Sequence, residues 1–133
     1  NIDSLSVSET IDPTLSRMTI VTSGSDQIVD QIVKQLNKLV NVIKVEDLTK
    51  EKHITREMCL LKVKAESRPK ALELAQKFEA KVLESNSKAI VLEITGDEDV
   101  LSRAFAAFQP LGLLEVVRTG MIAIQKGENV LVS

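Results

Sequence analysis

Apolar residues in the second half of this chain follow two different spacings, and the order of these spacings constrains the fold most. Alternating segments predict strands, and segments with helical spacing predict helices. The segments are a strand over residues 56–65, a helix over 67–82, a hairpin over 82–95, a helix over 97–110, a strand over 113–118 and a short extra strand over 121–125. This order predicts the ferredoxin-like arrangement, an antiparallel sheet with two helices on one face.

The first half has the same order without its opening strand and helix. Residues 2–10 and 15–22 predict a hairpin around Asp12-Pro13. An apolar stripe after Ser25 predicts a helix with Ser25 as its N-cap, and residues 40–47 predict a strand. Because the missing strand is central in this topology, we expect the native chain to start about 25 to 30 residues before Asn1.

We therefore expect an α+β protein with two ferredoxin-like (βαββαβ) modules, the N-terminal one lacking its first strand and helix. Residues 1–48 form this partial domain, and the charged residues 49–55 form a linker. Residues 56–125 form the C-terminal domain, and residues 126–133 form a tail, which we expect to be loose.

Composition excludes several classes of protein. The 133 residues carry 17 basic and 19 acidic side chains. The chain therefore has no excess of positive charge that would attract a polyanion such as nucleic acid. No apolar run approaches the ~20 residues of a membrane span. The single cysteine, Cys59, excludes an internal disulfide and suits a reducing, cytoplasmic location. None of the three Phe falls on a predicted strand, which counts against an RNA-recognition module.

Few residues are candidates for catalysis, metal binding or phosphate binding. Cys59 lies on the apolar face of a predicted strand, so we interpret it as a core residue and not as a nucleophile. His53 lies in the charged linker and has no metal-ligand partners nearby, which favours an exposed loop residue. Residues 97–99 are acidic, which is typical of a first helical turn and only weakly suggests a metal. Lys62 and Lys64 indicate a solvated face more than a phosphate site. We therefore predict no catalytic residue and no metal site.

Two loops bear on other activities. The loop over residues 66–69 is short and lacks glycine, unlike the anion-binding loop that an acylphosphatase-like enzyme needs after its first strand. Arg118-Thr119-Gly120 has two interpretations, which stay open: a close backbone approach to a ligand, or a tight turn or bulge.

Five sequence segments, in order and together, carry a resemblance to a known family. They are NIDSLSV at residues 1–7, PTLSRMTI at 13–20, QLNKLV at 35–40, REMCLLKV at 56–63 and EVVRTG at 115–120. Each is weak alone, but the combination resembles the regulatory (small) subunit of acetohydroxyacid synthase, also called acetolactate synthase.

The resemblance implies that the N-terminal module is an ACT domain and that the chain is a non-catalytic, cytoplasmic regulatory subunit, or a plastid one if the source is a plant. Such a subunit pairs as a homodimer and joins a thiamine-diphosphate-dependent catalytic subunit, which carries magnesium and FAD; it has no cofactor of its own. It raises catalytic activity and confers feedback inhibition by valine, or a related amino acid, in branched-chain amino-acid biosynthesis.

The family's effector site implies roles for the first two residues. Asn1 would bind the charged backbone groups of the effector, and Ile2 would line its apolar side. The glycine-containing loop that forms the other half of the site has no counterpart in these residues, so we expect weak valine binding or none. Two alternatives remain: another ACT-like amino-acid sensor, such as a transcription regulator, and a small ferredoxin-like enzyme.

Overall fold

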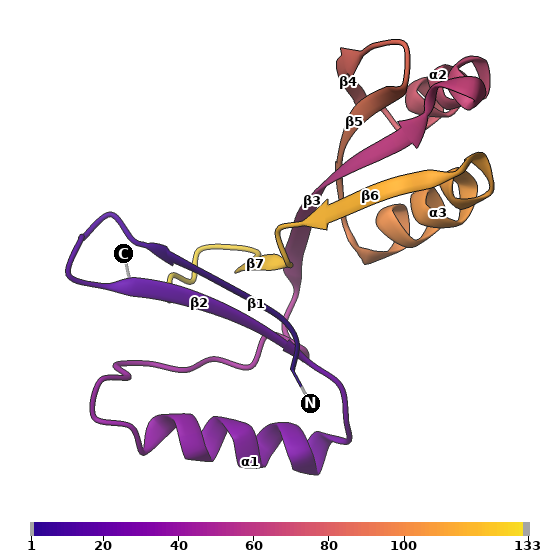
Figure 1. Cartoon of the computed structure of the whole chain (residues 1–133). Helices are drawn as coiled ribbons and strands as arrows, with labels where there is room; N and C mark the ends of the chain where they lie inside the picture. The colour runs from indigo at the N-terminus through magenta and orange to yellow at the C-terminus, as the bar shows by residue number, and fades with distance from the viewer. Residues whose placement is uncertain (1, 132–133) are drawn as a thin grey trace. The chain divides into compact units, whose positions relative to one another are not determined.

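The computed structural model describes residues 2–131 of the chain. It contains two compact units (Figure 1). The first unit contains the residues up to Ile54 together with those from Met121 onward, and the second unit runs from Thr55 to Gly120. Residues 121–125, which we assigned to the C-terminal domain, thus group with the first unit.

The second unit is the predicted ferredoxin-like module. Its elements are β3 (His53–Lys64), α2 (Arg68–Lys77), β4 (Lys81–Ser85), β5 (Ala89–Gly96), α3 (Glu98–Phe108) and β6 (Leu113–Arg118). The strands form an antiparallel sheet in the order β4-β5-β3-β6. The expected order of strands and helices is therefore confirmed.

The core of the second unit follows from the alternation along its two central strands. Leu61 on β3 lies opposite Leu92 on β5, and the alternate residues on either side are likewise fully buried. Each strand thus presents one apolar face to the helices. The buried set is Cys59, Leu61, Val63, Ile90, Leu92 and Ile94 from the strands, with Ala71, Leu74, Ala75, Leu101, Ala104 and Phe108 from the helices.

The two helices of the second unit differ at their N-termini. Asp97 caps α3, because its Oδ1 accepts a hydrogen bond from the Val100 N–H at 2.9 Å. Ser67 makes no cap hydrogen bond to α2. It is the last residue of a short 3₁₀ turn (Ala65–Ser67), and its hydroxyl instead donates to the Leu111 carbonyl at 2.7 Å. α2 therefore begins without a side-chain cap.

The first unit is built on β1 (Ile2–Glu9), β2 (Ser16–Thr22) and α1 (Asp26–Asn37). The two strands form the predicted antiparallel hairpin. Asp12 organises its turn, since its Oδ1 accepts hydrogen bonds from both the N–H and the hydroxyl of Thr14. Ser25 caps α1 as predicted, accepting from the Ile28 N–H.

The strand predicted over residues 40–47 does not form, and residues 42–47 take no regular structure. A strand needs a neighbour that satisfies its backbone groups. In the ferredoxin-like arrangement that neighbour is the central first strand, which is not among the described residues. The β-branched composition that favoured a strand could not replace the missing partner.

A short strand near the end of the chain completes the description of the first unit. It is β7 (Ile122–Gln125), which pairs with β3, and the Lys126 N–H donates to the Lys52 carbonyl at 2.8 Å. Arg17 on β2 donates to the Ala123 carbonyl at 2.9 Å. None of the helices over residues 2–131 is long and apolar enough to cross a membrane.

The two units differ sharply in how well they bury apolar side chains. All but one of the buried hydrophobic residues identified lie in the second unit; the exception is Met121. None of the residues of α1 is buried, although its apolar stripe is well formed. One helix and a two-stranded hairpin enclose too little volume for a core. The first unit therefore leaves apolar side chains of both strands and of α1 in the open.

Candidate functional site

The expected effector-binding residues lie where the hairpin of the first unit opens. Asn1 lies outside the described residues. Ile2 is the first residue of β1, lies opposite Thr22 on β2 and is 63% exposed. An aliphatic side chain this exposed can contact a ligand without any rearrangement of the fold.

The loop between β2 and α1 lies directly beside this end of the hairpin. The Ser23 hydroxyl donates to Asp3 Oδ2 at 2.6 Å, which ties the start of β1 to the loop. Gly24 has φ +142°, a conformation that side-chain-bearing residues rarely adopt, and a Cβ there would crowd Ile28. The carboxylate of Asp3, the residue after Ile2, is thus held at this end of the hairpin by the loop.

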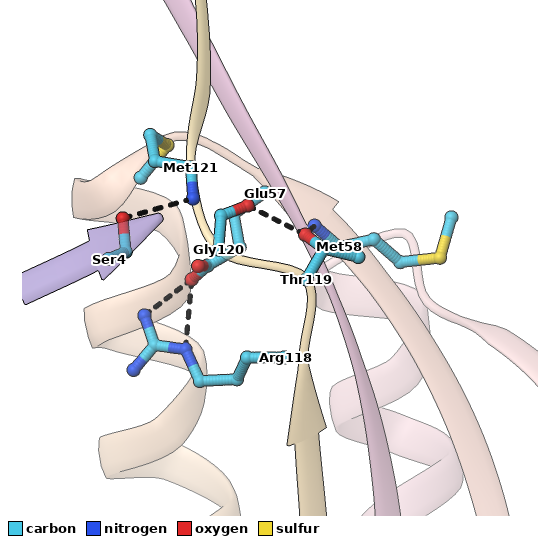
Figure 2. A network of polar contacts seen from close by, with 7 residues as sticks. All are labelled: Ser4, Glu57, Met58, Arg118, Thr119, Gly120 and Met121. Atoms are coloured by element: carbon cyan, nitrogen blue, oxygen red, sulfur yellow. Dashed lines mark hydrogen bonds and ion pairs between the residues drawn. The ribbon is translucent and has the colours of Figure 1, made fainter. Parts of the chain in front are cut away.

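A second polar site lies in the second unit, where the end of β6 meets β3 (Figure 2). Glu57 is the one polar or charged residue identified as buried, with 4% of its surface exposed. Arg118 donates to Glu57 Oε1 through Nε at 2.9 Å and through Nη2. The guanidinium also lies 4.9 Å from the centroid of the Phe105 ring. The carboxylate is therefore paired, as a buried charge must be.

Hydrogen bonds of backbone groups join β3 to the chain just after β6, beside the Glu57–Arg118 pair. The Thr119 N–H donates to the Met58 carbonyl at 3.0 Å, and the Met58 N–H donates to Thr119 Oγ1 at 3.1 Å (Figure 2). Gly120 follows with φ +85°. Arg118-Thr119-Gly120 is thus the irregular end of β6, held to β3 by these bonds, and residues 119–120 take no regular structure. In the first unit the next N–H, that of Met121, donates to Ser4 Oγ at 3.4 Å.

Sequence reasoning singled out Arg118 but missed Glu57. The signal was present, because Glu57 occupies the position two residues before Cys59 on the face that carries Leu61 and Val63. A carboxylate on a buried face needs a cationic partner. The sequence alone does not show which Lys or Arg that partner is.

The remaining candidates are structural. Cys59 is fully buried as predicted, and burial raises the pKa of its thiol, which disfavours the nucleophilic thiolate. Lys62 lies on an open sheet face with its Nζ 3.8 Å from Glu115. His53 is the first residue of β3, not a linker residue, and its Nδ1 lies 2.7 Å from the Glu51 carbonyl oxygen. Over residues 2–131, no cluster of three His, Cys, Asp or Glu side chains could hold a metal.

The second unit also has an open groove of about 670 Å³ beside the end of β5. Four basic side chains (Arg56, Lys77, Lys81 and Arg103) and three acidic ones (Glu79, Glu93 and Asp97) line it. Asp97 caps α3, and Arg103 pairs with Asp99. Two of its charged groups thus already have partners within the fold, and its mixed charge indicates no ligand class.

Comparison with known proteins decides the family. The family model described as the small subunit of acetolactate synthase matches residues 56–127. A model of the ACT domain of such subunits matches residues 1–44. The chain belongs to the acetolactate synthase small-subunit family. The resemblance carried by the five sequence segments is therefore confirmed, as is the fold class of two ferredoxin-like modules.

Individual members of the family match over nearly the whole chain. A probable acetolactate synthase small subunit of Archaeoglobus fulgidus is 42% identical over 131 residues, covering 97% of this chain and 82% of that protein. The small subunit of Haemophilus influenzae is 42% identical over 132 residues, covering 97% and 81%. The crystal structure of the Thermotoga maritima small subunit matches with a TM-score of 0.86 at 32% identity, covering 97% and 82%.

Proposed function

We propose that this chain is a non-catalytic regulatory subunit that binds an acetolactate synthase catalytic subunit, raises its activity and makes it sensitive to valine or a related branched-chain amino acid. The observation that carries this proposal is the match of both halves of the chain to models of one small-subunit family. Thiamine diphosphate, magnesium and FAD belong to the catalytic partner in this proposal. The protein itself binds none of them, and it works in the cytoplasm or, in a plant, the plastid.

The chemistry of the described residues supports a role without catalysis. The one cysteine is buried, and its thiol has a raised pKa. The one buried carboxylate identified, Glu57, is held by Arg118. Neither group is available to act on a substrate, whereas exposed apolar side chains in the first unit suit binding to other chains.

We assign effector contact to Asn1 and Ile2, with the charged groups of the amino acid near Asn1 and its aliphatic side chain against Ile2. In this proposal two copies of the first unit pair side by side, and the effector binds at that pairing surface. A bound effector must favour one arrangement of the subunits over another, and a coupling of about 1–3 kcal/mol changes activity about 5- to 150-fold.

A reconstitution titration tests the regulatory role. The chain is added to the catalytic subunit from the same source, and acetolactate formation is measured with and without valine. We expect saturable activation and at most weak inhibition by valine, because the glycine-containing half of the effector site has no counterpart in these residues. If the chain does not activate the catalytic subunit, the proposed function is wrong. Activation without any inhibition would support the subunit role and contradict the effector assignment.

Two matched alanine variants test the effector assignment itself. Ile2→Ala removes the exposed aliphatic side chain at the open end of the hairpin. Ile11→Ala removes an equally large side chain that is 90% exposed at the other end, in the hairpin turn. We expect Ile2→Ala to raise the valine concentration for half-inhibition while the degree of activation is unchanged, and Ile11→Ala to change neither. Equal effects of both variants would contradict a specific role for Ile2.

A further inference from the structure

The start of β1 contains a β-bulge at Asp3. Residues 4–9 of this strand pair with residues 16–21 of β2 in one unbroken register. Ile2 lies opposite Thr22, one residue out of that register, so Asp3 is an extra residue in the ladder. A bulge of this kind bends the strand and changes the face on which the neighbouring side chain lies.

The bulge decides on which face of the hairpin Ile2 lies. Opposed residues of an antiparallel pair share a face, and successive residues of a strand alternate between faces. One face, which we term the apolar face, carries Leu5, Val7, Met18 and Ile20. Thr22 belongs to it, so Ile2 belongs to it as well. Without the bulge Asp3 would lie opposite Thr22, and Ile2 would lie on the other face, which carries the serines of β1.

The loop between β2 and α1 holds the bulged residue. The Ser23 hydroxyl donates to Asp3 Oδ2 at 2.6 Å, a length typical of a hydrogen bond to a carboxylate, which is stronger than one between neutral groups. Gly24 follows with φ +142°, and Ser25 then caps α1 by accepting from the Ile28 N–H. The loop is therefore fixed at the helix as well as at the bulge.

We propose that Asp3 and Ser23 are positioning residues for the effector contact. Their hydrogen bond holds the bulge and thereby keeps Ile2 on the apolar face, beside Leu5, which is 50% exposed. In the register without the bulge a carboxylate would take the place of Ile2, and a carboxylate against the aliphatic part of an effector is unfavourable. The link to the effector rests on the proposed role of Ile2, whereas the link between Ser23 and the bulge does not.

Cysteine cross-linking within the hairpin of the full chain reports the register. In Ile2→Cys/Thr22→Cys the two thiols lie opposite each other only when the bulge is present. Opposed Cα atoms of an antiparallel pair are about 4.5–5.5 Å apart, within the ~4.4–6.8 Å range of disulfides. Val7→Cys/Met18→Cys is the matched control, because it joins two exposed residues in the register that the bulge does not alter. The native Cys59 is fully buried.

Each cysteine pair is combined with Ser23→Thr and with Ser23→Val, two side chains of the same shape of which only the first keeps a hydroxyl. Disulfide formation under mild oxidation is followed by mass spectrometry of peptides. We expect Ser23→Val to slow the Ile2/Thr22 pair at least about threefold relative to Ser23→Thr, because a hydrogen bond to a charged group is lost, and to leave the Val7/Met18 pair unchanged.

Three results of the cross-linking would overturn the proposal. The first is an equal rate for the Ile2/Thr22 pair in both Ser23 variants. The second is an equal slowing of both cysteine pairs by Ser23→Val, which would mean that the whole hairpin loosens. The third is failure of the Ile2/Thr22 pair to cross-link with Ser23 unchanged, which would mean that the bulged register does not form.

Reconstitution with the catalytic subunit tests the consequence for the effector. We expect Ser23→Val to raise the valine concentration for half-inhibition at least about threefold with the degree of activation unchanged, and Ser23→Thr to keep the native value. No difference between the two variants, or a change in activation alone, would overturn the positioning role. Absence of valine inhibition in the unsubstituted chain would contradict the effector assignment of Ile2 and this use of it, while the cross-linking still decides whether Ser23 holds the bulge.

Discussion

Glu79 is held in a backbone conformation that suits glycine. It follows the C-terminus of α2 with φ +54°, the one residue identified with a positive φ that is not glycine. Its N–H donates to the Gln76 carbonyl, and the Ala80 N–H donates to the Ala75 carbonyl at 2.7 Å. This pair of bonds is the Schellman motif, whose left-handed position is usually glycine. The helix end therefore carries a local strain that no contact of Glu79 explains.

Replacing this residue should stabilise the second unit. We expect Glu79→Gly to raise its unfolding free energy by about 0.5–1 kcal/mol, because a left-handed conformation costs an L-residue roughly 1–2 kcal/mol and glycine loses more entropy on folding. The measurement is denaturant-dependent hydrogen exchange of the β5 amides. The matched control is Glu98→Gly in the first turn of α3, which should lower stability by about 1 kcal/mol because that residue is helical. A loss of stability in both variants would mean that the positive φ of Glu79 does not strain the end of α2.

Burial of Cys59 predicts a pH dependence at high pH. Burial raises the pKa of its thiol in the folded protein, while in the unfolded chain the thiol ionises near about 8.5. The unfolded state alone loses this proton as the pH rises above about 8.5, so folding stability should fall there and be unaffected below. Urea unfolding between pH 8 and 10 measures this. Cys59→Ala should reduce the decline, and an identical pH profile in that variant would rule out the thiol as its cause.

At the level of elements, the Glu57–Arg118 pair joins β3 to β6 where backbone pairing between these strands ends. Replacing Arg118 by Met keeps an apolar side chain over Phe105 but leaves the carboxylate of Glu57 buried and unpaired. We expect Arg118→Met to cost about 1–3 kcal/mol of unfolding free energy, below the range for a fully buried pair because Arg118 is half exposed. The same hydrogen-exchange measurement of β5 reports the change.

A double-mutant cycle separates the ion pair from simple loss of packing. Glu57→Gln removes the charge that Arg118→Met leaves unpaired, so the double variant should be more stable than Arg118→Met alone. If the two single effects simply add, the pair contributes no coupling and β6 is held by backbone bonds and packing.

The elements that depend on local pattern were predictable from the sequence, while those that depend on a distant neighbour were not. The βαββαβ order, the hairpin and the Ser25 cap follow from the spacing of apolar residues and from the side chain that precedes the helix. The strand expected over residues 40–47 has the right composition but no partner among the described residues. The place of Glu57 on the buried face was visible in the sequence, but its partner was not, because Arg118 is 61 residues away. Asn1 and Ile2 were located only through the family resemblance.

At the scale of the whole molecule, stability is concentrated in one of the two units. The second unit encloses the apolar cluster around Leu61, Leu92 and Phe108, whereas α1 buries no residue. Regions with few buried apolar contacts open with low free energy, and core strands open only when their unit unfolds. The first unit is therefore the part whose conformation an effector or a partner chain can change most easily.

Hydrogen exchange of the full chain tests this difference between the units. We expect the β5 amides, such as those of Leu92 and Ile94, to exchange only through unfolding of the second unit, and those of β1, β2 and α1 to exchange orders of magnitude faster. If valine binds at Ile2, protection should rise in β1 and around Ser23, because a ligand that binds only the ordered state stabilises it. Equal protection in the two units without ligand would mean that the first unit is stabilised by contacts that these residues do not supply, as pairing with another copy of the chain would provide.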